Sequence, residues 1–104
     1  MSGSCCGGDQ AVGTTGEKLA VVQTQQKFHE FLKAANAPGA VDARTKRLIA
    51  IALSVLARCE PCVKSHVKKA RDEGISQEQI DEAAWMAISF GGSPTMMFYN
   101  HAKK

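Results

Sequence analysis

The sequence predicts an all-α fold, a compact bundle of about five helices. Apolar residues recur at spacings of three and four, and no segment shows the alternating pattern of a strand. Glycine, proline and capping residues divide the chain at intervals typical of short helices. The 104 residues, 44% hydrophobic and 22% charged, have the length and composition of one soluble globular domain. Its core is small, so stabilisation by oligomerisation is expected.

Residues 1–16, MSGSCCGGDQAVGTTG, are predicted to form a flexible tail, because few of their side chains are large and apolar. They lack the basic and apolar segments of a signal peptide, so the expected compartment is a reducing cytoplasm. Adjacent Cys5 and Cys6 would bridge each other only with strain. They are interpreted as incidental thiols, with capture of a soft ion or electron relay to a second thiol pair as alternatives.

The first helix is expected over residues 17–35 and the second from an N-cap at Asp42 to about Ala57. Pro38 and Gly39 separate them. The second half of the second helix is apolar nearly all round, which indicates burial on several sides or a subunit contact. The periodic apolar positions of the first helix are Leu19, Val22, Phe28, Phe31, Leu32 and Ala35.

Three further helices follow in the second half of the chain. The third is expected to start near Pro61, with Cys59 or Glu60 at its N-cap, and to end before Gly74. A capping box from Ser76 to Gln79 begins the fourth helix, which reaches about residue 90. After GGSP, a short fifth helix is expected over residues 95–102.

The segment CEPCVKSH places Cys59, Cys62 and His66 at the start of the third helix. Cys62 and His66 are four residues apart, so the imidazole is positioned to exchange a proton with the thiol. A helix N-terminus and a nearby imidazolium lower the pKa of a thiol, and the thiolate is the reactive form. Two cysteines three residues apart in a first helical turn are also close enough to form a disulfide. This pattern favours thiol redox chemistry.

Two structural interpretations compete with it. An inert thiol pair is disfavoured because the segment is polar. A zinc site would use the same three side chains, but structural zinc usually takes four ligands. The remaining candidates, Cys5, Cys6, His29 and His101, lie at no familiar spacing. No resident metal or cofactor is therefore expected. A metal- or metalloid-binding thiol module remains an alternative.

The stretch from Arg47 to Pro94 resembles the core of the alkylhydroperoxidase D and carboxymuconolactone decarboxylase superfamily. The resemblance rests on the apolar helix that leads into Cys-x-x-Cys-x-x-x-His, the helix end from Ala70 to Gly74, and FGGSP before the last helix. It implies a single alkylhydroperoxidase D-like helical domain over residues 17–104 that assembles into homo-oligomers, trimers or hexamers.

The cysteine-bearing members of this superfamily are similar to peroxidases and disulfide reductases. By analogy, Cys62 attacks the peroxide, Cys59 resolves the product, and His66 accepts and returns the proton of Cys62. An external dithiol, or a protein carrying one, supplies the electrons. The decarboxylase branch is an alternative, but it has no use for paired thiols.

Two positions depart from the family pattern. Arg47 stands where a glutamate of the proton relay is common, and it is interpreted as an auxiliary group that stabilises a thiolate. Glu60 is a second auxiliary candidate, as a substitute carboxylate or as a favourable charge at the helix start. The formal net charge of +3 is spread along the chain. No nucleic-acid or membrane partner is expected.

Overall fold

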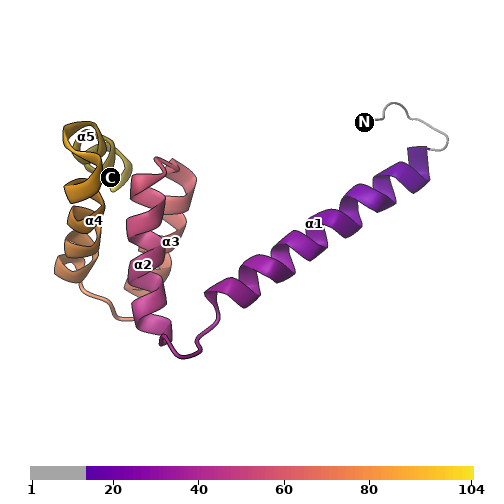
Figure 1. The fold of residues 1–104 in the computed structure, drawn as a ribbon, viewed down its shortest axis with the longest axis horizontal. Helices are drawn as coiled ribbons and strands as arrows, with labels where there is room; N and C mark the ends of the chain where they lie inside the picture. Colours follow the sequence, from indigo (N-terminus) through magenta and orange to yellow (C-terminus); the bar gives the residue numbers. More distant parts are fainter. Residues whose placement is uncertain (1–13) are drawn as a thin grey trace. The chain divides into compact units, whose positions relative to one another are not determined.

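The computed structural model describes residues 14–104 and contains five helices and no strand in that part of the chain (Figure 1). The all-α prediction is confirmed. Residues 1–13 of the predicted tail, which include Cys5 and Cys6, lie outside the described part of the chain. The chain divides into two units between Asn36 and Ala37. The helices are α1 (Thr14–Asn36), α2 (Ala43–Leu56), α3 (Glu60–Asp72), α4 (Gln77–Gly91) and α5 (Ser93–Ala102).

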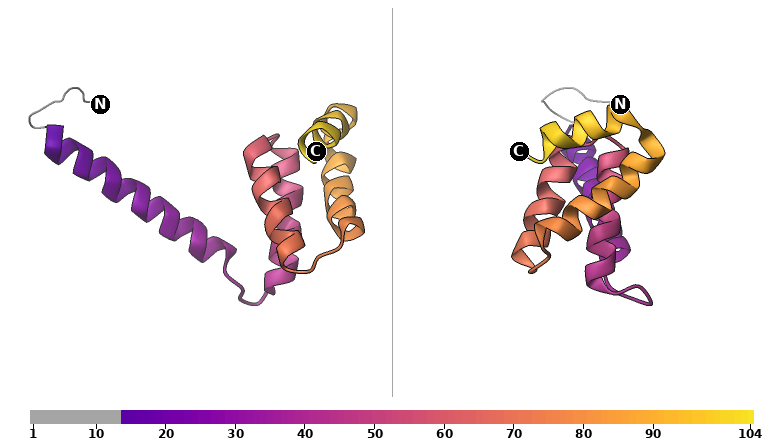
Figure 2. Two further views of the ribbon diagram at one scale, coloured as in Figure 1. Left: turned by 180° about the vertical axis from the view of Figure 1, so that it is seen from behind. Right: turned by 90° about the vertical axis from the view of Figure 1, so that its left-hand side faces the viewer.

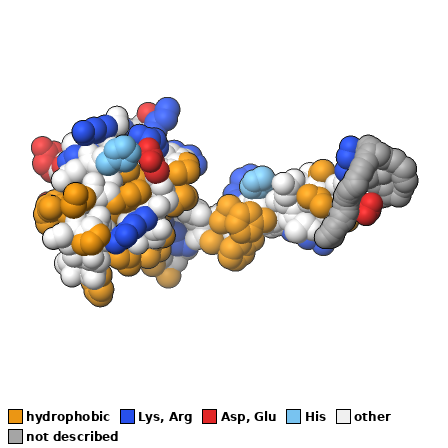
Figure 3. Space-filling view, turned by 90° about the horizontal axis from the view of Figure 1, so that it is seen from above, with side chains coloured by type: hydrophobic (Ala, Val, Ile, Leu, Met, Phe, Trp, Pro, Cys, Tyr) orange, Lys and Arg blue, Asp and Glu red, His pale blue; other side chains and the backbone are white. Residues whose placement is uncertain are grey.

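The first unit consists of α1, which begins three residues before the predicted start. Its periodic apolar side chains are exposed, and hydrophobic groups are visible along its surface in Figure 3. The rings of Phe28 and Phe31 lie 6.3 Å apart on this surface. Helices of globular proteins depend largely on packing of their apolar face. This face is therefore available for a contact beyond the helix itself.

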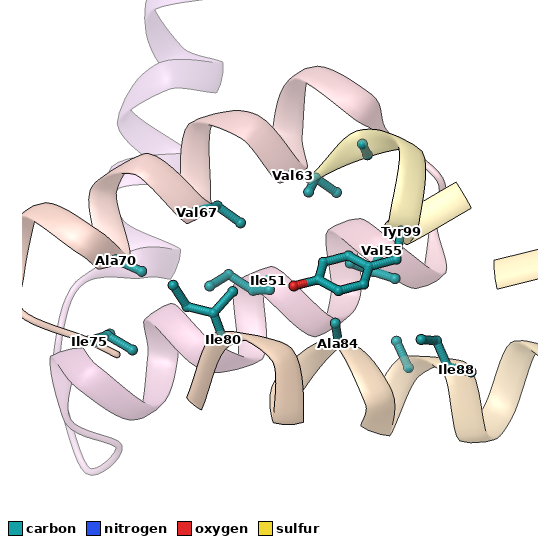
Figure 4. Packing of buried hydrophobic residues seen from close by; sticks show 12 residues of the cluster. Ile51, Val55, Val63, Val67, Ala70, Ile75, Ile80, Ala84, Ile88 and Tyr99 are labelled. Atoms are coloured by element: carbon teal, nitrogen blue, oxygen red, sulfur yellow. The ribbon is translucent and has the colours of Figure 1, made fainter. Parts of the chain in front are cut away.

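The second unit is a bundle in which α2 packs against α3, α4 and α5. α5 lies across one end of the bundle (Figure 2). Figure 4 shows side chains from the four helices converging on a common core, with the ring of Tyr99 among them. The buried apolar residues are Ile51, Val55, Val63, Val67, Ala70, Ile75, Ile80, Ala84, Ala87, Ile88, Tyr99 and Ala102.

Local signals in the sequence set the helix ends. Oδ1 of Asp42 accepts a hydrogen bond from the Thr45 amide at 2.7 Å, as expected of an N-cap. Ser76 and Gln79 form the predicted capping box at the start of α4. Gly74 adopts a left-handed conformation with φ 85° after α3. These three predictions are confirmed.

The turn between α4 and α5 depends on Gly91. A Cβ at this position would overlap the side chain of Thr95, which is itself buried on α5. Gly92 follows with φ 76°, a conformation that glycine adopts at little cost. The two glycines allow α5 to start at Ser93, two residues earlier than predicted, and to pack closely on α4.

Tyr99 is the largest fully buried side chain, and its hydroxyl joins α5 to α4. Oη donates a hydrogen bond of 2.5 Å to Oδ1 of Asp81. Burial, together with this carboxylate, raises the pKa of Tyr99 well above its usual value. Burial also opposes ionisation of Asp81, but donors outweigh it and lower the pKa of that carboxyl. These donors are Tyr99, Gln77 and Lys103.

We expect Tyr99→Phe to lower the free energy of unfolding by about 1–2 kcal/mol at pH 7, because the partly buried carboxylate of Asp81 loses one of its donors. Tyr99 is the chain's one tyrosine. Because the pKa of Tyr99 is raised in the folded state, its contribution to the free energy of unfolding is complete below pH 10. The contribution is lost as the pH rises above 10, where the phenol ionises first in the unfolded chain. Urea unfolding at pH 7 and at pH 10.5–11 measures both effects. Equal alkaline losses in the wild type and Tyr99→Phe would contradict this assignment.

Candidate redox site

A tight turn brings the end of α2 and the start of α3 together. Ala57 is the C-cap of α2, and the next two residues close a Schellman motif. The amide of Arg58 donates to the Val55 carbonyl and that of Cys59 to the Ser54 carbonyl, both at 3.1 Å. This motif normally takes glycine at its left-handed position, but here Arg58 adopts φ 56°. The backbone therefore accepts a conformational cost directly before the first cysteine.

Cys59 belongs to both helices. Its amide completes the end of α2, while its carbonyl accepts the first bond of α3, from the Val63 amide at 3.0 Å. Cys59 is the N-cap of α3, in an extended conformation, and Pro61 lies in the first turn as predicted. Both cysteines therefore lie where the unpaired amides of α3 and its positive dipole end are found.

The two sulfurs are joined in a disulfide, Cys59–Cys62, with a Cα–Cα distance of 5.2 Å. The prediction that these residues are close enough to bond is confirmed. Cys62 is exposed and Cys59 is half-buried. The pair can therefore cycle between dithiol and disulfide at the start of α3, where Cys62 is exposed to solvent. Which sulfur attacks first stays a prediction.

His66 lies one turn after Cys62 on α3 and is half-buried. Its described hydrogen bond is with Arg47 on α2, whose Nη1 lies 2.8 Å from Nδ1 of the imidazole. Burial lowers the pKa of His66, the positive charges of Arg47 and Lys69 lower it further, and Glu73 opposes them. The neutral ring is thus the favoured form at pH 7.

Arg47 forms a two-pronged ion pair with Glu73, the C-cap residue of α3. Nε and Nη2 of the guanidinium each lie 3.0 Å from a carboxylate oxygen. The hydrogen bonds from Arg47 lower the pKa of Glu73. Glu73 is not among the site residues predicted from the sequence. Its spacing of seven residues from His66, two helical turns, was the signal that could have found it.

The second auxiliary candidate, Glu60, points toward other partners. Its carboxylate lies 3.8 Å from Nζ of Lys64 and 3.6 Å from Nε2 of His101. Lys64 also donates to the Ala102 carbonyl at 3.2 Å. These contacts connect the start of α3 to the end of α5. They give Glu60 a structural function, while its predicted catalytic contribution stays a prediction.

Within residues 14–104, no three His, Cys, Asp or Glu side chains are grouped so that they could hold a metal ion. Cys5 and Cys6 lie outside this range. His29, on α1, lies beside Phe28 with a ring separation of 6.4 Å. None of the helices in the same range combines the length and the hydropathy that crossing a membrane requires.

Known proteins are similar to this chain over most of its length. The profile of the carboxymuconolactone decarboxylase family matches residues 23–102. An uncharacterized protein of the cox locus of Paracoccus denitrificans is 39% identical over 94 residues, which cover 90% of this chain and 80% of that protein.

Two solved structures have similar folds. A carboxymuconolactone decarboxylase family protein from Thermotoga maritima, a candidate for involvement in antioxidative response, aligns with a TM-score of 0.72 and 31% identity over 77% of this chain and 82% of its own. A family member from Legionella pneumophila, in its apo form, aligns with a TM-score of 0.74 and 29% identity over 86% and 80%.

We expect Arg58→Gly to raise the free energy of unfolding of the reduced protein by about 0.5–1 kcal/mol. Glycine adopts the left-handed conformation without the steric cost that the Cβ of arginine adds. Gly74 occupies the equivalent position after α3, and a Cβ there meets nothing within 4 Å. Gly74→Ala should therefore lower the stability by about 1 kcal/mol through its backbone conformation alone. Gly39→Ala, also in open space, is the near-neutral control. Destabilisation by Arg58→Gly would contradict the assignment.

Proposed function

Because the chain belongs to the carboxymuconolactone decarboxylase family, we propose that it is a thiol-dependent oxidoreductase that reduces peroxides through Cys59 and Cys62. The observation that carries the proposal is the disulfide between these residues at the N-terminus of α3. The Thermotoga maritima relative, a candidate for involvement in antioxidative response, supports the same chemistry.

The cycle starts from the dithiol. The Cys62 thiolate attacks the peroxide, so that an S–O bond forms and the O–O bond breaks. The released alkoxide or hydroxide takes a proton from solvent and leaves as alcohol or water. The Cys59 thiol then attacks the Cys62 sulfenic acid, which releases water and forms the disulfide. An external dithiol returns two electrons and two protons by thiol–disulfide exchange.

The exposure of the two cysteines supports this assignment of steps. Cys62 is the more exposed of the two residues, which favours it as the one that meets the peroxide, whereas the half-buried Cys59 is better suited to capture the sulfenic acid. Both sulfurs lie at the positive end of α3, which stabilises a thiolate. We assign His66, one turn further along the helix, to hydrogen-bond the Cys62 sulfur.

The cycle also determines the partners and the compartment that we propose. The reductant is a small dithiol or a protein that carries one, and a reducing cytoplasm supplies such molecules. The decarboxylase reaction ranks behind the redox cycle, because it leaves the exposed disulfide unused.

We also propose that the chain forms homo-oligomers, either trimers or hexamers. Several large apolar side chains of the Ala37–Lys104 unit are exposed, in a bundle whose core consists mainly of alanine, valine and isoleucine. Phe90 on α4 is 81% exposed and Met97 on α5 is 68% exposed. Large exposed apolar side chains are common at protein–protein contacts.

Peroxide consumption coupled to a dithiol reductant tests the proposed chemistry. We expect Cys62→Ser to abolish turnover and Cys59→Ser to allow at most one turnover, because the sulfenic acid then has no internal partner. A free-thiol count before and after peroxide should show the loss of two thiols in the wild type. Ser65→Ala, at an exposed position between Cys62 and His66, is the control.

Equal rates in both cysteine variants and the wild type would remove the pair from the mechanism. Bound zinc at one per chain, released together with the thiol loss, would favour the metal-binding alternative.

Light scattering coupled to gel filtration tests the oligomer. We expect the wild type to elute at three or six times the chain mass and Phe90→Glu to shift toward the monomer, since a buried charge at a contact is costly. Glu82→Lys, at an exposed polar position of the same helix, should leave the mass unchanged. A monomeric wild type at micromolar concentration would exclude the proposed assembly.

A further inference from the structure

The guanidinium of Arg47 uses all three of its nitrogens on side chains from one neighbouring segment. Nε and Nη2 bind the two carboxylate oxygens of Glu73, each at 3.0 Å, and Nη1 lies 2.8 Å from Nδ1 of His66. The Arg47 side chain is only 18% exposed. A two-pronged carboxylate pair fixes the plane of a guanidinium. Glu73 therefore aims Nη1 at the imidazole.

The contact between Arg47 and His66 decides where the imidazole carries its proton. A guanidinium has N–H donors only and keeps its charge at every accessible pH. Nδ1 of His66 must therefore accept the hydrogen bond, and the proton of the neutral ring lies on Nε2. Protonation of Nδ1 would turn two N–H groups toward each other and place two positive charges side by side.

The two basic groups around His66 favour the same neutral state, and the charge of Glu73 opposes it. Arg47 faces the ring from α2, and Lys69 and Glu73 lie on α3 and its C-cap. Both oxygens of Glu73 are engaged by Arg47, so the carboxylate balances the guanidinium and leaves the ring to accept from Nη1. Burial of the ring adds to the preference for the neutral form.

We propose that Arg47 and Glu73 are positioning residues that hold His66 neutral with its proton on Nε2, so that the ring donates a hydrogen bond to the Cys62 sulfur and does not remove its proton. The consequence for Cys62 rests on the proposed function. The thiol proton leaves to solvent, and the Nε2–H group stabilises the thiolate that remains. This reverses the sequence-based expectation that His66 acts as a base.

Nuclear magnetic resonance of the full chain with labelled histidines tests the proton position without any activity measurement. The imidazole ¹⁵N and ¹³C shifts distinguish the two neutral tautomers, and His66→Gln assigns the signal among the chain's three histidines. In the reduced wild type, we expect the Nε2–H tautomer and a pKa for His66 below its ordinary value. In Arg47→Met, the ring should populate both tautomers and its pKa should rise.

Two further variants separate the hydrogen bond from charge and from folding. Lys69→Met removes a nearby positive charge but keeps the Arg47 contact, so the tautomer should stay Nε2–H while the pKa rises. Glu73→Gln loosens the guanidinium and should lower the Nε2–H fraction, which keeps the test decisive if Arg47→Met fails to fold. A wild type with its proton on Nδ1, or a tautomer that changes in none of these variants, would overturn the proposal.

The pH profile of Cys62 alkylation by iodoacetamide, in a Cys59→Ser background, tests the consequence for the sulfur. A neutral donor predicts one inflection, from the thiol alone, and a rate at pH 7 reduced up to roughly tenfold by His66→Gln, equivalent to one pKa unit. Arg47→Glu combined with Glu73→Gln should give a second inflection, from an imidazolium–thiolate pair. A second inflection already present in the Cys59→Ser protein would overturn the proposed donor role. Confirmed tautomers with no peroxide turnover would instead reject the proposed function and leave the proton assignment standing.

Discussion

The site depends on how α2 ends and α3 begins around a single residue. The Cys59 amide completes the hydrogen bonding of α2, and its carbonyl begins that of α3, so neither helix can shift without the other. The left-handed backbone of Arg58 makes this direct junction possible. Because the junction folds α3 back against α2, a residue two turns along α3 can meet one near the start of α2. The cysteines lie at the junction itself, where the amides of α3 are unpaired.

The polar side chains near the cysteines form an ordered series from α2 to the end of α3. Glu73 holds Arg47, Arg47 donates to His66, and His66 lies one turn from Cys62. The basic groups in this series and the dipole of α3 both stabilise the thiolate form of a cysteine at this position. A carboxylate in place of Arg47 would reverse the hydrogen bond to the ring. The arginine is thus compatible with thiol redox chemistry, although it changes the way a histidine can assist it.

The small core of the Ala37–Lys104 unit explains why so much apolar surface remains outside. Its buried side chains are mostly alanine, valine and isoleucine, and Tyr99 is the aromatic residue that they enclose. Met96 and Phe98 are partly buried against this core, whereas Trp85 and Phe90 are exposed. Residue type alone does not separate these two groups, because both consist of large apolar side chains. A bundle of this size has a modest stability of its own, so association would contribute to it.

The sequence by itself determined the features that arise within one or two helical turns. The caps at Asp42 and Ser76, the glycine stop at Gly74 and the bonding distance of Cys59 and Cys62 all follow from local backbone geometry, which residue type and spacing encode directly. Only the tertiary structure decided the partners of Arg47, the contact of Glu60 with His101 and the exposure of Phe90. Arg47 meets His66 and Glu73 across 19 and 26 residues of sequence. Such contacts depend on how the helices pack, and no local pattern specifies which side chain of a neighbouring helix will lie within bonding distance.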